Sequence, residues 1–491
     1  MLANVLLAGT AFTLGQLAMC SGTALVLGLV CAALALSGCN AAASRTGAAV
    51  SAVTSGVSEP AVVGTVLDCT GTENVTISKA GSYTLTGDLQ GCVVVDVGKN
   101  DKVELILQNL TVTAADGPAL WVRQADKVTV TLAEGTASAL TDGSVYTDQT
   151  DEEPNAALFC DADLTIQGTG ALTVTGKFDH AIRCKDDLVV DGGVLTLSAV
   201  GKGLKAKKTL TVNGGDITIL NSEEGIEANT ILLAGGTLDL TASDDGINAS
   251  SPDNWDGDAP SLTVSGGTVL VDAQGDGLDS NGALMVSGGV LLIAGSTGSG
   301  DSALDAEQTP VITGGVVMAA GGQGMAVNFG GSSTQASWLA SSGEQAAGTS
   351  LTMVDDTGAV LAHWTPGKSY QCVTLSTPAM AQGGSYTLLT GAAVDGADEH
   401  GFADSGAAVG GETAAQTTLE SLNQSDVQGK GGGMRGGMMP GADGERPEKV
   451  FGENGGRGGK MDMTPPDDMA GATPPDMKNE MREFGSIGEN T

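Results

Sequence analysis

Acidic residues recur beside a glycine at matching positions in successive repeats of this 491-residue chain. Ten residues after the second glycine of four Gly-Gly pairs stands a further glycine: Gly203, Gly225, Gly246 and Gly277. The residues directly before these glycines are Lys202, Glu224, Asp245 and Asp276. The residues two positions after them are Lys205, Glu227, Asn248 and Asp279. Because the count is the same in each repeat, we expect two stacked columns, flanked by Glu223 and Asp244, with Asp305 as a candidate to continue the second column after an insertion.

Carboxylates stacked about 5 Å apart repel one another, so they must be protonated, paired or bridged by a cation. Lys202 and Lys205 can neutralise only the first acidic repeat. Oxygen ligands around a glycine corner suit calcium, which accepts irregular geometry and roughly six to eight oxygens. The predicted calcium ligands are Glu224, Glu227, Asp244, Asp245, Asn248, Asp276 and Asp279. The alternative is an outward acidic ladder that holds only water and bulk ions.

The elements that must position these columns are short strands on either side of six Gly-Gly pairs. The pairs begin at Gly192, Gly214, Gly235, Gly266, Gly288 and Gly314, which are 22, 21, 31, 22 and 26 residues apart. Apolar residues alternate before and after each pair, as in Val194-Leu195-Thr196-Leu197, and no segment between Leu188 and Asp305 shows the period of a helix. A repeat of this length with period-two alternation indicates a solenoid, in which each repeat of three short strands is one coil of a parallel β-helix.

The solenoid is predicted to occupy residues 62–340, and strands between residues 341 and 395 are predicted to form a small C-terminal β cap. A cap is needed because the open end of a solenoid exposes its core and unpaired strand edges. Residues 40–61 are rich in Ala, Ser, Thr and Gly and are expected to be a flexible tether. Residues 396–491 are predicted to be a disordered, low-complexity tail rich in Gly, Met and Pro.

Residues 1–39 form an apolar leader that ends in Leu36-Ser37-Gly38-Cys39, which resembles a bacterial lipobox. That resemblance implies cleavage before Cys39, a lipid on its sulfur and a protein anchored on the outer face of the bacterial membrane. No Lys or Arg precedes Arg45, although signal peptides normally carry a basic segment. A pair of membrane helices is therefore the alternative.

Two pairs of cysteines have spacings close to one coil and are candidate disulfides. Cys69 and Cys92 are 23 residues apart, and Cys160 and Cys184 are 24 apart. The second pair occupies equivalent positions of one repeat, where Cα atoms on adjacent coils lie within the range that a disulfide spans. We therefore expect these pairs either to be bridged, as in an extracellular protein, or to stack as buried free thiols.

The formal net charge of −36 argues against a nucleic-acid partner. An insertion between Ser250 and Asp258 lengthens one coil and carries Asp253, Trp255 and Asp256. Insertions in solenoids often lie on the binding face, so these three residues are candidates for contacting a polysaccharide. The alternative for Trp255 is a side chain that only anchors its own loop.

The strings Ser-Glu-Glu-Gly-Ile-Glu-Ala and Ala-Ser-Asp-Asp-Gly-Ile-Asn-Ala, repeated between Gly-Gly strands behind a lipobox, resemble a bacterial carbohydrate-binding domain family. That family is related to a clostridial cellulose- and pectin-binding β-helix protein. The resemblance covers roughly residues 62–395 and implies a right-handed parallel β-helix that binds calcium and acidic or cellulosic polysaccharide. The family's ligand positions correspond best to the acidic-glycine corners, where Lys202 and Lys205 depart from an all-acidic ladder.

Three functions fit such a protein: non-catalytic binding, catalysis by a polysaccharide lyase, and a surface adhesin or structural role. A lyase needs a base beside the metal, commonly Arg or Lys, and here the nearby basic residues include Lys202 and Lys205, which we expect to pair with Glu224 and Glu227. No pair of carboxylates stands out as a hydrolase centre. We therefore favour a cell-surface lipoprotein that binds polysaccharide with calcium and without catalysis.

Overall fold

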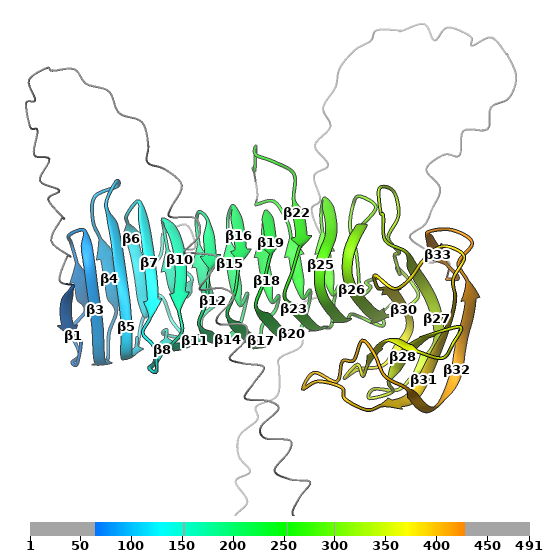
Figure 1. Cartoon of the computed structure of the whole chain (residues 1–491). Helices are drawn as coiled ribbons and strands as arrows, with labels where there is room; N and C mark the ends of the chain where they lie inside the picture. The colour runs from blue at the N-terminus through cyan, green and yellow to red at the C-terminus, as the bar shows by residue number, and fades with distance from the viewer. Residues whose placement is uncertain (1–63, 151–152, 253, 299, 428–491) are drawn as a thin grey trace, which may run out of the picture. The chain divides into compact units, whose positions relative to one another are not determined.

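The computed structural model describes residues 64–427, except for residues 151, 152, 253 and 299, and its regular elements are the strands β1 to β33 (Figure 1). This confirms the predicted all-β class. Within this described part, no helix is long and apolar enough to cross a membrane. The predicted leader with Cys39, the tether, and residues 428–491 of the predicted tail lie outside the described residues.

Most strands run parallel to their neighbours in stacked coils, and each coil of the central part contributes one strand to each of three faces. The first face, the short-strand face, is one nine-stranded sheet. Its strands are β2 (Val75–Ile77), β4 (Val93–Asp96), β6 (Leu120–Gln124), β9 (Ala156–Cys160), β12 (His180–Cys184), β15 (Leu204–Ala206), β18 (Ile226–Ala228), β21 (Ile247–Ala249) and β24 (Leu278–Ser280). A further bridge joins Leu278 to Leu304 and extends this face by one coil.

The other two faces belong to a single 20-stranded sheet. The strands before each Gly-Gly corner and their equivalents are β7 (Lys127–Leu132), β10 (Asp163–Gly168), β13 (Leu188–Val190), β16 (Thr209–Val212), β19 (Thr230–Leu233) and β22 (Ser261–Val264). The strands after it are β8 (Ala137–Thr141), β11 (Ala171–Gly176), β14 (Val194–Ala199), β17 (Asp216–Asn221), β20 (Thr237–Ala242) and β23 (Thr268–Ala273). The remaining solenoid strands are β1 (Thr65–Asp68), β3 (Gly81–Leu89), β5 (Lys102–Thr113), β25 (Ala283–Ala294) and β26 (Val311–Gly321).

Apolar side chains stack in register along the solenoid and fix how the coils align. On the short-strand face, five successive strands are paired through one fully buried inward column: Ile182, Leu204, Ile226, Ile247 and Leu278. Burying one such side chain stabilises the fold by roughly 1.5–3 kcal/mol. A shift by one residue would turn the whole column outward, so the register of the polar columns beside it is strongly specified.

Glycines serve two different purposes at the corners of the coils. The second glycine of each Gly-Gly pair has a positive φ between 79° and 100°, a conformation that side chains with a Cβ rarely adopt. The glycine after each acidic residue is needed for close packing instead. A Cβ at Gly246 would lie 2.4 Å from Val271 Cγ1 and 2.5 Å from the Gly277 carbonyl oxygen.

Gly246→Ala is therefore expected to destabilise the protein by about 1–3 kcal/mol, the usual cost of inserting an atom into a well-packed core. Thermal unfolding followed by circular dichroism measures this as a lower Tm. Gly300→Ala is the matched control, because a Cβ there meets no atom within 4 Å. Equal Tm values for the two variants would contradict the packing role of Gly246.

A C-terminal cap follows the solenoid. β26 pairs antiparallel with β30 (Tyr370–Ser376), which also pairs with β27 (Ser337–Gln345), and β27 pairs with β33 (Asn423–Ser425). A separate antiparallel sheet has the order β29 (Val360–Trp364), β28 (Leu351–Asp355), β31 (Ser385–Val394) and β32 (Ala408–Thr418). The hydrophobic core of the cap includes the buried side chains of Trp338 and Tyr370.

The cap extends further along the chain than the residue boundaries 341–395 predicted. β32 pairs with β31 over its whole length, and β33 completes the sheet edge beside β27. Residues 408–425, which the composition assigned to a disordered tail, therefore belong to the cap. Their small and polar side chains suit an edge strand, and pairing with β31 supplies the order that composition alone does not indicate.

The five described cysteines are all buried free thiols. Cys160 and Cys184 are register partners on β9 and β12, which confirms that they lie on adjacent coils, and both thiols donate to the Ala162 carbonyl oxygen at 3.1 Å. Cys69 and Cys92 are not register partners. The Cys69 amide bonds Thr86 and the Cys92 amide bonds Asn74, so their spacing of about one coil does not bring them to equivalent positions.

Candidate binding face

One outward column runs along the whole short-strand face. Its members are register partners on successive strands: Thr76, Val94, Trp121, Phe159, Arg183, Lys205, Glu227, Asn248 and Asp279. The column changes from aromatic through basic to acidic character along the chain. Its last four members confirm the predicted alignment of Lys205, Glu227, Asn248 and Asp279, and the bridge to Leu304 places Asp305 next in line.

The other predicted column is also in register. The backbone amides of Gly203, Gly225 and Gly246 donate to the carbonyl oxygens of Glu224, Asp245 and Asp276 on the following coil. The side chains continue this pattern at the acidic end, because Asp245 Oδ1 accepts from the Asp276 amide at 2.7 Å, and Asp276 Oδ1 accepts from the Ser302 amide. Glu223 and Asp244, which flank this column, are exposed.

Burial gives several carboxyls of the acidic end unusual protonation equilibria. It raises the pKa of Glu224, Asp276 and Asp279 to about 7, and nearby carboxylates add to the effect. It also raises the pKa of Asp245 above its ordinary range. Placing negative charge on all of these groups at neutral pH is therefore unfavourable unless a cation offsets it.

Lysines neutralise the first acidic coil, as the sequence predicted. Lys202 Nζ lies 2.6 Å from Glu223 Oε2 and 3.5 Å from Glu224 Oε1, and Lys205 Nζ lies 2.8 Å from Glu227 Oε2. Among the described residues, no Lys, Arg or His forms an ion pair with Asp245, Asp276 or Asp279.

Two buried oxygen atoms at this end lack any hydrogen-bond donor: Glu224 Oε2 and Asn248 Oδ1. Glu224 is only 9% exposed, so water does not readily replace the missing donor. Orphaned oxygens among carboxylates match the hard oxygen donors that calcium prefers. The residues of the acidic end therefore fit a cation chemically, although their oxygens do not converge as three carboxylates within 4.8 Å in the described part of the chain.

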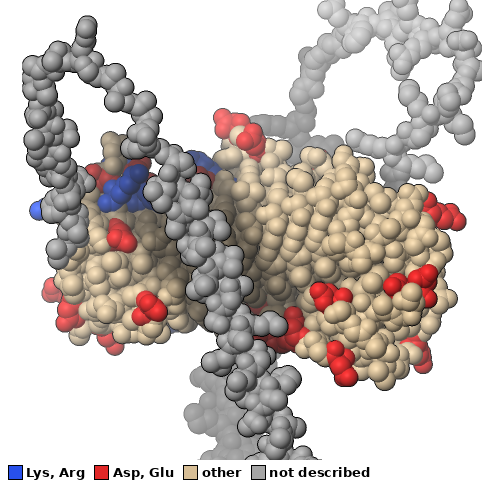
Figure 2. Space-filling view, viewed as in Figure 1, with Lys and Arg blue, Asp and Glu red and all other residues tan. Residues whose placement is uncertain are grey.

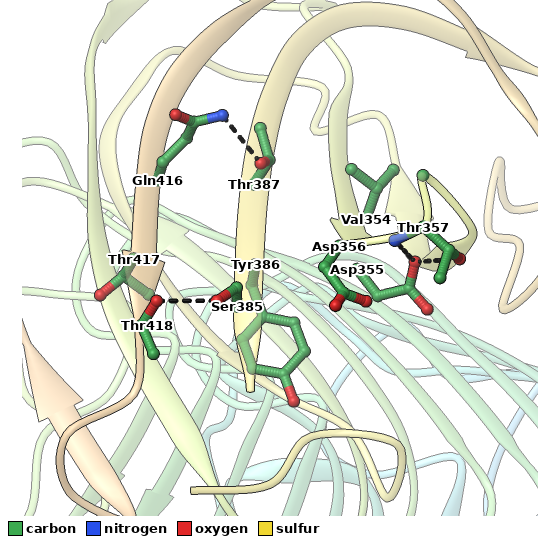
Figure 3. A pocket seen from close by; sticks show the side chains of 11 residues that line it. Val354, Asp355, Asp356, Thr357, Ser385, Tyr386, Thr387, Gln416, Thr417 and Thr418 are labelled. Carbon is green, nitrogen blue, oxygen red and sulfur yellow. Dashed lines mark hydrogen bonds between the residues drawn. The ribbon is translucent and has the colours of Figure 1, made fainter. Parts of the chain in front are cut away.

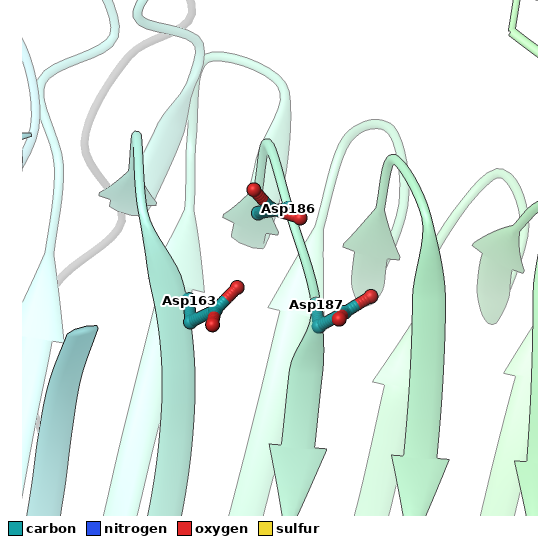
Figure 4. A group of neighbouring side chains, drawn as sticks. All are labelled: Asp163, Asp186 and Asp187. Atoms are coloured by element: carbon teal, nitrogen blue, oxygen red, sulfur yellow. The ribbon is translucent and has the colours of Figure 1, made fainter. Parts of the chain in front are cut away.

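A group that the sequence did not single out does converge this closely. Asp163 at the start of β10, and Asp186 and Asp187 just before β13, offer oxygens within 4.8 Å of one another (Figure 4). The alignment of Cys160-Asp-Ala-Asp163 with Cys184-Lys-Asp-Asp187 would have identified the pair Asp163 and Asp187. Lys208 already pairs with Asp186, and the Thr209 amide donates to Asp187, so this group is partly satisfied by the protein itself.

A basic groove of about 820 Å³ lies next to the acidic end on the same face. Its cationic side chains are Arg183, Lys185, Lys202, Lys205 and Lys207. In Figure 2, carboxylates are scattered over the visible surface, whereas Lys and Arg gather in a small part of it. The groove is also bordered by Ser250, Ser251 and Pro252, where the predicted insertion begins.

An aromatic groove of about 360 Å³ lies toward the N-terminal end of the face. Trp121 lines it with a partly exposed ring, and the Arg123 guanidinium lies 3.8 Å from the ring centroid. Polar side chains that surround the ring include Asn74, Gln90 and Asp116. The sequence alone does not single out Trp121, because its neighbours come from coils without Gly-Gly markers.

Trp255, the tryptophan of the insertion, is bonded within its own loop, unlike Trp121. The Trp255 indole N–H donates to the Asp258 carbonyl oxygen at 2.8 Å, and the ring lies over Gly257. These contacts are those of a side chain that anchors its loop. Asp256 is exposed, and Asp253 lies outside the described residues.

The cap carries a polar groove of about 660 Å³ between β28, β31 and β32 (Figure 3). Its polar groups largely bind one another. Asp355 accepts hydrogen bonds from Thr357 and Ala359, Ser385 bonds Thr418, and Gln416 donates to Thr387. These hydrogen bonds already satisfy the polar side chains that they join.

Comparison with known proteins covers most of this face, because the residues matched by the family model include its strands from β2 to β21 but not β24. The family model of carbohydrate-binding domain-containing proteins matches residues 71–258. A carbohydrate-binding domain-containing protein of Acetivibrio thermocellus is 32% identical over 229 residues, which are 44% of this chain and 77% of that protein. The solved structure of a polysaccharide lyase-like protein from C. thermocellum, a gadolinium derivative, is 29% identical with a TM-score of 0.38, and the match covers 42% of this chain and 90% of the other.

Proposed function

Because the chain belongs to the family of carbohydrate-binding domain-containing proteins, we propose that its short-strand face binds a polysaccharide without catalysis. The observation that carries this proposal is the outward column in which an aromatic groove precedes a basic groove and an acidic end. A polysaccharide extends over several sugar units, and two grooves at different coils of one face offer it more than one point of contact.

The aromatic groove supplies the kind of contact that a sugar ring needs. The Trp121 ring offers an apolar face to the C–H groups of a pyranose, while amide and carboxylate groups nearby can bond its hydroxyls. Arg123 stacks on the ring at 3.8 Å and holds it in place. We infer that Trp121 is the main stacking platform.

Calcium is the second part of the proposal. The ligands would come from Glu224, Asp245, Asn248, Asp276 and Asp279, with Glu227 and Asp244 beside them. A bound calcium would supply a positive centre that satisfies the orphaned oxygens of Glu224 and Asn248 and offsets the repulsion between the stacked carboxylates. These residues would also hold the cation next to the basic groove, where a sugar carboxylate could reach it.

The alternative is a calcium-dependent polysaccharide lyase, whose base would be a neutral Lys or Arg. Burial lowers the pKa of Lys202, but its hydrogen bond and ion pairs with Glu223 and Glu224 outweigh burial and raise that pKa above its ordinary value. A lysine that stays protonated is a poor general base. This favours binding over lyase chemistry.

We also infer that the solenoid is a right-handed parallel β-helix, because crossovers between parallel strands of one sheet are almost always right-handed. The motif Leu36-Ser37-Gly38-Cys39 supports a lipid anchor on Cys39 and a location on the outer face of the bacterial membrane.

Affinity electrophoresis through cellulosic polysaccharide and through polygalacturonate, with calcium and with chelator, tests the proposal. We expect retardation by at least one polysaccharide and no release of unsaturated sugars. Unsaturated product would identify a lyase. Absence of retardation by every glycan would favour an adhesin or structural role.

A further inference from the structure

A carboxylate of the protein itself pairs with two cations of the basic groove. Glu153 Oε1 lies 2.6 Å from Arg183 Nη2, and its other oxygen, Oε2, contacts Lys185 Nζ. Asn155 Oδ1 accepts from Arg183 Nη1 at 2.5 Å and holds the guanidinium in place. The position between Arg183 and Lys185 is therefore shaped for a planar anion that has two oxygens.

Lys and Arg side chains gather in this groove, together with the carboxylates Glu153, Asp179, Glu223 and Glu227. Five of the chain's 22 Lys and Arg residues line the groove, in a protein that has 58 Asp and Glu residues. Lys202 and Lys205 are held by Glu223 and Glu227, carboxylates of the next coil. Arg183 and Lys185 are held mainly by Glu153, which belongs to the segment between β8 and β9 rather than to a stacked strand.

The same segment borders both grooves. Thr147 and Asp148 line the aromatic groove, and Glu153 and Asn155 line the basic groove. Trp121, Phe159 and Arg183 are consecutive members of the outward column, but Phe159 is buried, so a sugar chain that stacks on Trp121 reaches Arg183 by passing over the segment that borders both grooves.

We propose that Arg183 and Lys185 form the seat for the carboxylate of an acidic sugar, and that the Glu153 side chain fills this seat in the free protein. This rests on the proposed polysaccharide binding and adds its charge specificity. The ligand carboxylate replaces the Glu153 carboxylate at the same two cations, so neither cation is left unpaired in the complex. Because an anionic sugar must displace the Glu153 carboxylate, Glu153 lowers the affinity of the seat for that sugar.

Glu153→Gln removes the competing charge and keeps the side-chain shape. Isothermal titration of this variant with oligogalacturonides in chelator is expected to show affinity about 3- to 10-fold tighter than wild type, with a steeper loss on added salt. Chelator removes any bound calcium, so the measured affinity does not include a contribution from calcium. Affinity for neutral cello-oligosaccharides is expected to stay unchanged.

Asp126→Asn is the matched control, because it removes one carboxylate that pairs with Lys102 away from the groove. It is expected to leave the affinity for oligogalacturonides unchanged. Lys185→Gln is expected to weaken binding of oligogalacturonides and not of neutral oligosaccharides, and it tests the seat independently should Glu153→Gln fold poorly.

Weaker or unchanged binding of oligogalacturonides by Glu153→Gln, together with unchanged binding by Lys185→Gln, would overturn the proposal. Equal gains for Glu153→Gln and Asp126→Asn would also overturn it, because they would show a general charge effect. If wild-type protein bound neither acidic nor neutral sugars, the proposed function itself would fail.

Discussion

Trp121→Ala is expected to weaken polysaccharide binding by roughly 30-fold, the largest effect of any single substitution on the short-strand face. A tryptophan at the centre of a binding site commonly contributes about 2 kcal/mol or more, and about 1.4 kcal/mol corresponds to a tenfold change in affinity. The partly exposed ring, stacked under Arg123 in its own groove, meets the conditions for such a contribution. Isothermal titration with oligosaccharides of the polysaccharide that retards the protein measures it.

Trp255→Ala is the control, because it removes the same side chain from the insertion. The Trp255 indole N–H is already bonded within its loop, so we expect little change in affinity. A large loss for Trp255→Ala and none for Trp121→Ala would move the platform to the insertion, as the sequence alone suggested. Circular dichroism of both variants separates lost binding from lost folding.

Calcium is expected to raise the Tm of the wild-type protein by several degrees, and this gain should largely disappear in the double variant Asp245→Asn and Asp276→Asn. A ligand at about one hundred times its Kd stabilises the folded state by roughly 2.7 kcal/mol. Both substitutions keep an Oδ1 acceptor for the amides of Asp276 and Ser302, so they remove charge with little change in hydrogen bonding. In chelator, the double variant should be as stable as wild type or more stable, because mutual repulsion is reduced.

The pH dependence provides an independent measurement of the cost of ionising the buried carboxyls of the acidic end. The pKa values of Glu224, Asp276 and Asp279 are raised to about 7, from ordinary values of 4.5 for Glu and 3.8 for Asp, so the folded state binds more protons than the unfolded state between these pH values. In chelator, the free energy of unfolding should therefore fall as pH rises from about 4 to about 7. Calcium should flatten this slope, since it binds the ionised carboxyls.

Equal Tm shifts of the double variant in calcium and in chelator would show that the acidic end is only a solvated ladder. Asp163→Asn serves as a control for cation binding elsewhere, because Asp163 belongs to the other carboxylate group, beside Lys208. If this substitution alone removed the calcium effect, the cation would lie at that second group.

The repeats in the sequence determined the fold class and the alignment of its acidic end. Equal counts from each Gly-Gly pair to the next acidic-glycine step give coils of matching length, so Glu227, Asn248 and Asp279 had to stack in register. The apolar alternation decided which residues face inward, as the buried column from Ile182 to Leu278 shows. The pairing of Lys205 with Glu227 followed from the same alignment.

Only the tertiary structure determined which residues are neighbours on adjacent coils of unequal length. Cys69 and Cys92 are separated by nearly the same number of residues as Cys160 and Cys184, yet only the second pair is in register, because residue spacing defines position within a coil only where coil lengths agree. Trp121 and Phe159 are 38 residues apart and are nevertheless neighbours, since the extra residues between them leave the stack. Glu153 comes from that same interval and reaches Arg183 and Lys185 through space, a contact that depends on how the interval folds over the face and not on any repeat.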